Sequence, residues 1–240
     1  MNLESCIRFT EIFLAIAFMQ QSIEHFSSIK QERRLFVTKF IYSTALLVAA
    51  LISATTLSKW ILLILFINRL FILKYFQGPY NGGSDSMSIL ILSVLCMSRF
   101  STELEWQVYA FGYLALQLLM SYFIAGSVKI MNPDWRNGKA LQDLFEFSAY
   151  PSSESLRKLS SQATLLLILS WAVILFELLF PLALIHQTSL VIALLLAFCF
   201  HLGMSFIFGF NRFVWTWLAA YPAILWFHQH YSSVLGMIWH

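Results

Sequence analysis

Residues 163–208 read ATLLLILSWAVILFELLFPLALIHQTSLVIALLLAFCFHLGMSFIF, and Glu177 is the only Asp, Glu, Lys or Arg among them. A helix that spans a bilayer needs about 20 predominantly apolar residues. The stretch therefore predicts two consecutive membrane spans, at 163–186 and 189–208. Of all 240 residues, 59% are hydrophobic and 11% are charged, whereas a soluble domain carries about 25% charged residues. The composition excludes a soluble globular protein.

Further apolar stretches predict spans at 7–25, 37–57, 60–76, 86–99, 106–126 and 213–228. We therefore expect an all-α, polytopic integral membrane helical bundle of about eight transmembrane helices, forming a single domain over 1–240. Seven spans are the alternative count, because the fourth stretch is short and the first is polar. The expected location is the bacterial inner membrane, with membrane lipid around the bundle.

The placement of lysine and arginine predicts the orientation of the chain. If the N-terminus faces outside, the outer side carries Arg8, Lys59 and Arg99, and the other twelve of the 15 Lys and Arg residues lie inside. Cytoplasmic loops of membrane proteins carry such an excess of basic residues. With eight spans, both termini are expected outside.

The one long stretch outside the predicted spans covers about 128–162. Asn132 followed by Pro133 is typical of a helix start, with Asn as the N-cap and Pro in the first turn. Leu141, Leu144 and Phe145 then recur at helical spacing. This pattern predicts one amphipathic helix lying in the membrane interface.

Several functions find no support in the sequence. Cys6, Cys96 and Cys199 are far apart and form no CxxC pair, so neither a disulfide framework nor a zinc site is indicated. The sequence contains no other metal-ligand cluster. The net charge is only +3, and no basic run extends beyond 30–39, so nucleic-acid binding is not expected.

Glu177 is a candidate functional residue because it lies well inside a predicted span. Ionisable residues at membrane depth are costly and commonly mark functional sites. Pro181 follows four residues later and lacks an N–H, so it leaves the carbonyl of Glu177 without its helical partner. The structural alternative is a carboxyl group that holds two helices together.

Lys129 ends the span at 106–126 in a polar or small stripe at i+4 spacing, which also contains Gln117, Ser121 and Ala125. Gly126 beside it allows another backbone to come close. From spacing alone, a lysine that extends to the interface is the simpler interpretation. His201 is a further candidate, with Ser205 one turn later, although a lone histidine on an apolar helix is more often a packed residue.

Arg69 lies near the centre of its predicted span and needs an anion, which Glu177, Glu11 or Asp85 could supply. The loop FQGPYNGGSDSM, residues 76–87, contributes Asn81 and Asp85 as candidate binding residues. A helix-capping role for the loop is the alternative. It lacks the spacing of a P-loop or a dinucleotide fingerprint.

The stretch SYFIAGSVKIMNPDWRNGKALQDL, residues 121–144, resembles a segment of the vitamin K-dependent gamma-carboxylases and of the related HTTM (horizontally transferred transmembrane) domain family. The matching residues are Tyr122, Phe123, Ala125, Gly126, Lys129, Asp134, Trp135 and Gly138. A second stretch, FHLGMSFIFGFNRFVWTWLAAYP (200–222), is similar to the family's helix that opens with a histidine. The resemblance covers about 105–228, and the lumenal-loop histidine of the carboxylases has no counterpart in NGGSDSM.

The resemblance implies a function. In the carboxylases the lysine of this motif is the base that deprotonates vitamin K hydroquinone, so Lys129 would be the base here. Reaction with oxygen would then give a strongly basic alkoxide able to remove a weakly acidic C–H proton, and carbon dioxide could trap the carbanion. A buried lysine is suited to such a role because burial favours its neutral amine.

We therefore expect a membrane enzyme that uses a lipid quinol of the vitamin K type to modify a peptide or small protein. The expected catalytic residues are Lys129, Glu177 and His201. The expected binding residues are Asp85, Asn81, Trp135, Arg69, Tyr122 and Ser205. The alternative is a non-catalytic HTTM subunit that binds a lipid or a partner in a peptide maturation or export complex.

Overall fold

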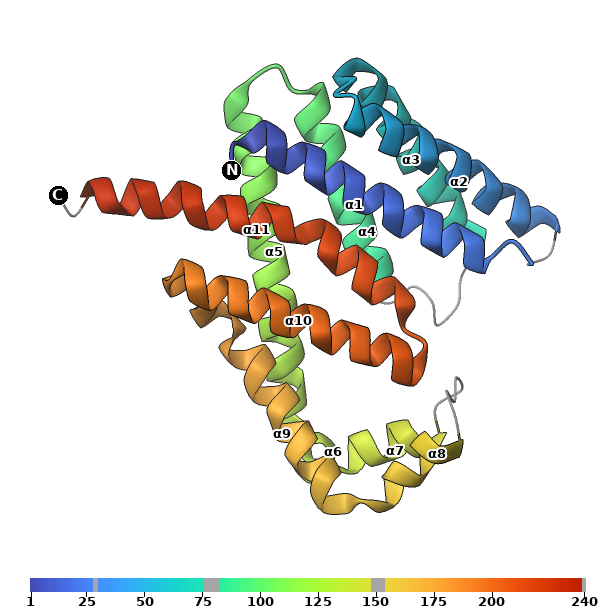
Figure 1. Cartoon of the computed structure of the whole chain (residues 1–240), viewed down its shortest axis with the longest axis vertical. Helices are drawn as coiled ribbons and strands as arrows, with labels where there is room; N and C mark the ends of the chain where they lie inside the picture. Colours follow the sequence, from blue (N-terminus) through green and yellow to red (C-terminus); the bar gives the residue numbers. More distant parts are fainter. Residues whose placement is uncertain (28–29, 76–82, 148–153, 239–240) are drawn as a thin grey trace. The chain divides into compact units, whose positions relative to one another are not determined.

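The computed structural model describes residues 1–27, 30–75, 83–147 and 154–238, which contain helices and no strand. The helices of the first half are α1 (Leu3–Glu24), α2 (Lys30–Leu51), α3 (Thr55–Tyr75), α4 (Gly83–Phe100) and α5 (Leu104–Met131) (Figure 1). The later elements are α6 (Pro133–Arg136), α7 (Lys139–Phe147), α8 (Glu154–Arg157), η1 (Lys158–Ser161), α9 (Ala163–Leu179), η2 (Phe180–Ile185), α10 (Gln187–Phe208) and α11 (Asn211–Ile238). The all-α prediction is confirmed.

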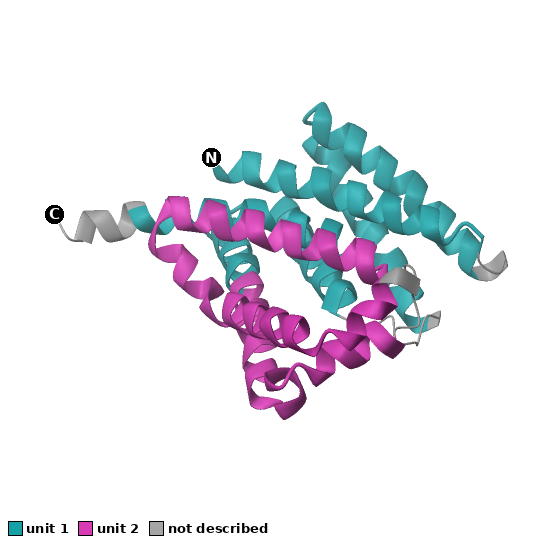
Figure 2. Cartoon of the chain, turned by 60° about the horizontal axis from the view of Figure 1, so that its bottom comes forward, with its two compact units in different colours: residues 1–116, 212–240 teal, residues 117–211 magenta. Residues whose placement is uncertain are grey.

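The chain divides into two compact units (Figure 2). The first unit contains Met1–Leu116 and Arg212–His240, and the second contains Gln117–Asn211. Helix α5 contributes its first half to the first unit and its second half to the second. Each unit is described separately below.

The first unit is a helical bundle in which α1 packs against α2 and α4, and α3 packs against α2 and α4. Its interior is formed by aliphatic side chains with no exposed surface, among them Leu14, Leu46, Leu62, Ile91 and Leu95. At the end of α4, Arg99 bonds Glu4 and Glu11 of α1, and its Nε lies 2.6 Å from Glu11 Oε1. This ion pair gives Glu11 its counter-charge, so Glu11 is not the partner of Arg69.

In the second unit, the α-helical part of α9 ends at Leu179 and continues as the 3-10 helix η2, with Pro181 in its first turn. Proline in this position removes a backbone donor, so the regular α-helical hydrogen bonds cannot continue. Helix α10 ends at Phe208 and is followed by Gly209, which has φ 73°, a left-handed conformation suited to glycine. His186, whose backbone is extended, joins the two long apolar segments.

The segment predicted to begin at Asn132 does so. The Asn132 side chain accepts a hydrogen bond from the N–H of Asp134 at 2.9 Å, and Pro133 opens α6. In α7, Leu141 and Phe145 are buried against Leu166 and Phe208 of α9 and α10. Protein therefore covers much of the apolar face that the sequence pattern directed toward lipid.

Six helical segments of the described residues are long and apolar enough to cross a membrane. They are Leu3–Glu24, Glu32–Leu51, Thr55–Lys74, Leu104–Met131, Ala163–Ile185 and Gln187–Phe208. Only 28% of the Ala163–Ile185 window is buried in the protein, as expected where lipid contacts an apolar helix on most sides. The protein is an integral membrane protein. The count of eight spans is not confirmed, because α4 and α11, although helical, do not meet the same criterion.

Candidate functional site

The second unit contains a charged pair formed by two of the predicted catalytic residues. Lys129 Nζ donates to both carboxylate oxygens of Glu177, at 2.9 Å to Oε1 and 2.7 Å to Oε2. The side chain of Lys129 is 18% exposed and that of Glu177 is 5% exposed. Helices α5 and α9 therefore bring a base and an acid, 48 residues apart in the chain, into direct contact.

Gly126 explains how the two helices come close enough for this contact. A Cβ atom at Gly126 would lie 2.7 Å from the backbone nitrogen of Leu178 and 3.0 Å from Glu177 Cβ. These distances leave no space for any side chain at position 126. The close backbone approach expected at Gly126 is confirmed.

Trp135 lies over the ammonium group of Lys129, with Nζ 5.1 Å from the centre of its ring. Its position is set by α6, which is bound to α9 through two hydrogen bonds: Ser170 Oγ donates to the carbonyl of Trp135, and Trp171 Nε1 donates to the carbonyl of Arg136 at 3.0 Å. At this distance the ring and the ammonium group make a cation–π contact. Lys129 thus has one anionic and one aromatic partner.

Tyr122 and His201 form a second polar pair in the same unit. The tyrosine hydroxyl and His201 Nε2 are 2.9 Å apart, and both residues are buried. Tyr122 precedes Lys129 by seven residues on α5, so the two side chains share a helix face about 10 Å apart along the axis. The structure therefore places His201 near Lys129 only through Tyr122, two turns away.

Aromatic rings that the sequence analysis did not single out surround this second pair. Tyr122 stacks on Phe180 with ring centres 4.1 Å apart. Phe176 contacts the rings of Tyr122, Phe180 and Phe200, and Phe200 contacts His201. In a sequence that is 17% aromatic, single phenylalanines carry no signal. Only their contacts with Tyr122 or His201 distinguish these three.

The other predicted site residues lie elsewhere. Ser205 donates its hydroxyl hydrogen bond to the Asn211 side chain, a partner that the sequence did not suggest. Arg69 and Asp85 form a buried ion pair in the first unit, so Asp85 is the anion that Arg69 was expected to need. Asn81 lies outside the described residues.

The geometry of the second unit suits proton transfer and the binding of an aromatic group. Its polar groups are an amine, a carboxylate, a phenol and an imidazole, all on helices rather than loops. Among the residues described, no group of three or more His, Cys, Asp and Glu side chains converges in a way that could hold a metal ion. The Trp135 ring lies beside Lys129, and the rings of Phe176 and Phe180 lie beside Tyr122.

Comparison with known protein families identifies a domain in this chain. The HTTM domain matches residues 94–230, more than half of the chain, and this range includes Lys129, Glu177 and His201. No match was found among curated proteins or among solved structures. On the strength of that domain match, the chain belongs to the HTTM family.

Proposed function

We propose that the protein is a membrane enzyme in which Lys129 is the base that removes a proton from a hydroxyl group of a lipid-soluble quinol. The observation that carries this proposal is the contact of Lys129 with Glu177 within a span, at 2.7 and 2.9 Å. The helical and aromatic surroundings exclude much of the water around the pair. An ionisable pair in such a position is costly to maintain, and this favours a use in chemistry.

Glu177 would accept a proton from Lys129 and so leave the lysine as a neutral amine. An amine acts as a base only when it is neutral, and an ammonium group 2.7 Å from a carboxylate can pass its proton directly to that carboxylate. In a surrounding of low polarity, the neutral pair of amine and carboxylic acid competes with the ion pair, because neither partner then carries a charge. Glu177 would then hold the proton while Lys129 accepts one from the substrate hydroxyl.

The rest of the site fits a flat aromatic head group. Trp135 offers a ring beside Lys129, and Tyr122 and His201 offer a hydrogen-bonding pair about two helical turns away. Neutral His201 can exchange roles with the Tyr122 hydroxyl, one donating while the other accepts. These residues would bind and orient the quinol, and the apolar rings of Phe176 and Phe180 would keep water from it.

The quinol would supply the oxygen-dependent chemistry, and the second substrate is proposed to be a peptide or small protein in the bacterial inner membrane. This part of the proposal rests on the resemblance of residues 121–144 to the carboxylase segment. HTTM membership supports it at the level of the family, through the shared membrane domain.

The second candidate function is a non-catalytic subunit that binds a lipid or a partner. One observation favours it: both oxygens of Glu177 already accept from Lys129. A structural bridge between two helices requires nothing more. The two candidates differ in whether Lys129 must lose its proton.

The deciding experiment measures quinol oxidation and oxygen uptake by the purified full-length protein in lipid nanodiscs supplied with a reduced naphthoquinol. Empty nanodiscs correct for spontaneous oxidation. Lys129→Arg and Lys129→Ala should each lower the rate by about 100-fold or more, the usual contribution of a positioned base. A small added amine should restore part of the activity of Lys129→Ala. Lys139→Ala, an exposed lysine of the same unit, is the matched control and should keep the native rate.

Arginine separates the two candidates because it keeps the charge and length of the side chain and cannot release its proton near neutral pH. Activity in Lys129→Arg close to native would show that the base assignment is wrong. Native protein that copurifies with quinone and never oxidises quinol would support the binding subunit instead.

A further inference from the structure

The first unit contains a buried group of charges that the proposed enzyme site does not use. The group lies where α1 ends, α3 approaches its end, and α4 and α11 begin. Its cations are Lys39, Arg69 and Arg212, and its carboxylates are Glu24 and Asp85. Three cations thus share two carboxylates, and one of these two is partly in solvent.

Of the three basic side chains, Lys39 is the one that forms no ion pair with a carboxylate of the described residues. It is 1% exposed, and its ammonium group donates to the neutral side chain of Gln21 and lies 4.0 Å from the centre of the Phe18 ring. No carboxylate of the described residues is within 4.0 Å of its Nζ. Its charged neighbours within electrostatic range are Arg69, Arg212 and Asp85, of which two are cations.

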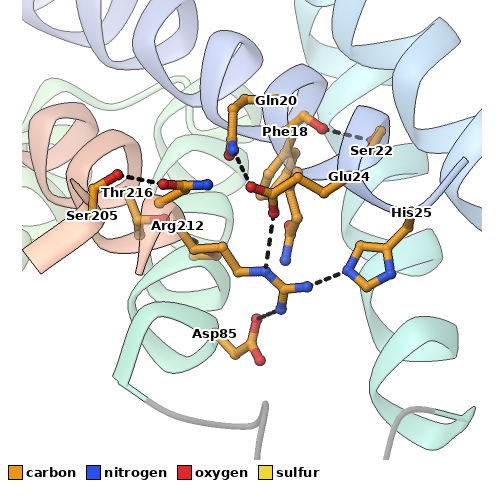
Figure 3. Close-up of polar contacts among 12 residues, drawn as sticks. Phe18, Gln20, Ser22, Glu24, His25, Asp85, Ser205, Arg212 and Thr216 are labelled. Carbon is orange, nitrogen blue, oxygen red and sulfur yellow. Dashed lines mark hydrogen bonds and ion pairs between the residues drawn. The ribbon is translucent and has the colours of Figure 1, made fainter. Parts of the chain in front are cut away.

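The two carboxylates, Asp85 and Glu24, lie beside Arg69 and Arg212. Arg69 is 2% exposed and bonds Asp85 through Nη2, but its buried Nε has no hydrogen-bond partner. Figure 3 shows Arg212 extended between Asp85, Glu24 and His25. The guanidinium lies 4.0 Å from each of the two carboxylates and bonds His25 Nε2.

His25 contributes no negative charge, so it does not compensate the three basic side chains. Its ring stacks on Phe36 at 4.0 Å and accepts from Arg212, which requires an unprotonated Nε2. Burial and the positive charges of Arg212 and Lys39 lower the pKa of His25 to about 4. Burying an uncompensated charge is strongly unfavourable, and an anion bound beside these three basic side chains would compensate their charges.

The depth of the group in the membrane indicates which anion this is. Lys39 lies seven residues inside the Glu32–Leu51 span and Arg69 five residues before the end of Thr55–Lys74, or about 8–10 Å along a helix. The group therefore lies closer to the end of these spans than to the middle of a hydrocarbon core about 30 Å thick, at a depth near the lipid head groups. Arginine and lysine donors together are the usual partners of phosphate. The side chain of Arg212 is 17% exposed, so solvent and lipid can reach this edge of the group.

We propose that Lys39, Arg69 and Arg212 form a binding site for a phosphate group, supplied by an anionic phospholipid or by free phosphate. The phosphate would accept from Lys39 and from the unpartnered Nε of Arg69, and Arg212 would close the outer side. This site lies in the first unit and is independent of the proposed function of Lys129.

The test measures thermal unfolding and lipid retention of the full-length protein. Protein in a nonionic detergent with phosphatidylcholine receives phosphatidylglycerol in one arm, inorganic phosphate in a second, and sodium chloride at equal ionic strength in a third. The native protein should be stabilised by at least one phosphate source and not by chloride. Stabilisation by phosphatidylglycerol alone identifies the lipid, and stabilisation by inorganic phosphate identifies the free ion.

Lys39→Met keeps the length of the side chain and removes its charge. It should bind the phosphate source about tenfold more weakly or worse, as expected for the loss of a charge-assisted hydrogen bond. It should also be more stable than the native protein without phosphate, because the unpaired charge is gone. Lys59→Met is the matched control, since Lys59 also lies over a phenylalanine ring, at 4.3 Å from Phe100, in the same unit. It should bind like the native protein.

Two results would overturn the proposal. One is that neither phosphatidylglycerol nor inorganic phosphate stabilises the native protein more than sodium chloride does. The other is native affinity in Lys39→Met. If that variant does not fold, Arg212→Gln takes its place, and native mass spectrometry of the unmodified protein must still show phosphatidylglycerol retained in preference to phosphatidylcholine.

Discussion

Replacing Gly126 by alanine tests the packing on which the Lys129–Glu177 contact depends. The added Cβ would lie 2.7 Å from Leu178 N, so α5 and α9 must separate by about 0.7 Å to reach an ordinary contact near 3.4 Å. The same separation would stretch the bonds of Lys129 to Glu177, now 2.7 and 2.9 Å, past the usual hydrogen-bond range. Overpacking of this kind costs about 1–3 kcal/mol.

Gly203→Ala is the matched control for this substitution. Gly203 also lies within a helix of the second unit, and a Cβ there meets no atom within 4 Å. Both variants gain the same helix propensity, about 1 kcal/mol, so their difference isolates the steric cost at Gly126. A chain of this size changes its Tm by about 2–4 °C per kcal/mol, and we therefore expect Gly126→Ala to melt about 2–12 °C below Gly203→Ala.

The assay is thermal unfolding of both variants in one detergent, followed by tryptophan fluorescence, together with the quinol oxidation rate. Gly126→Ala should lose activity as well as stability, because its ion pair is displaced. Equal melting temperatures for the two variants would refute the close packing of α5 on α9. Lower stability with an unchanged rate would refute the dependence of activity on the Lys129–Glu177 geometry.

Three further predictions concern single side chains. Glu177→Gln should abolish activity and cost about 3 kcal/mol of stability, because it leaves the Lys129 charge unpaired. The double variant Lys129→Met, Glu177→Leu should recover most of that stability. Full activity in Glu177→Gln would show that the carboxylate has only a structural role between the two helices. The pKa of His25 is lowered to about 4 in the folded protein, so between about pH 6.5 and 4 the unfolded chain binds a proton that the folded protein does not. The melting temperature should therefore decrease as the pH is lowered from about 6.5 to about 4. The decrease should be smaller in His25→Gln. Identical pH profiles would contradict the buried contact of His25 with Arg212. A cysteine placed at Ser27, in an otherwise cysteine-free protein, should react with an impermeant reagent only after the cells are opened, because the 30–39 region is predicted to be cytoplasmic. Labelling in intact cells would show that the predicted orientation is wrong.

Much of the site could be predicted from local sequence patterns. Asn132 and Pro133 begin α6 as expected, because capping depends on neighbouring residues alone. Gly126 was identified as a point of close approach because small residues are the ones that allow helices in membranes to touch. Glu177 and Lys129 were each singled out by their cost in an apolar environment, and they proved to be partners.

The pairings of charges could not be predicted. Glu11, Asp85 and Glu177 were all possible partners for Arg69. In the structure Glu11 is paired with Arg99 and Glu177 with Lys129, and Asp85 is the partner of Arg69. Coulomb attraction acts between charges that are near in space, and their separation in the sequence carries no information about that distance.

By itself, the sequence determined the class of the molecule, because a chain with so few charged residues cannot cover a soluble surface. It also determined the helical segments and the HTTM membership that its motifs carry. The tertiary structure alone decided that α7 packs its apolar face on Leu166 and Phe208 and that Lys39 has no carboxylate beside it in the described part of the chain. A helical pattern states which face is apolar, and only the packed fold determines whether lipid, another helix or an opposite charge meets that face.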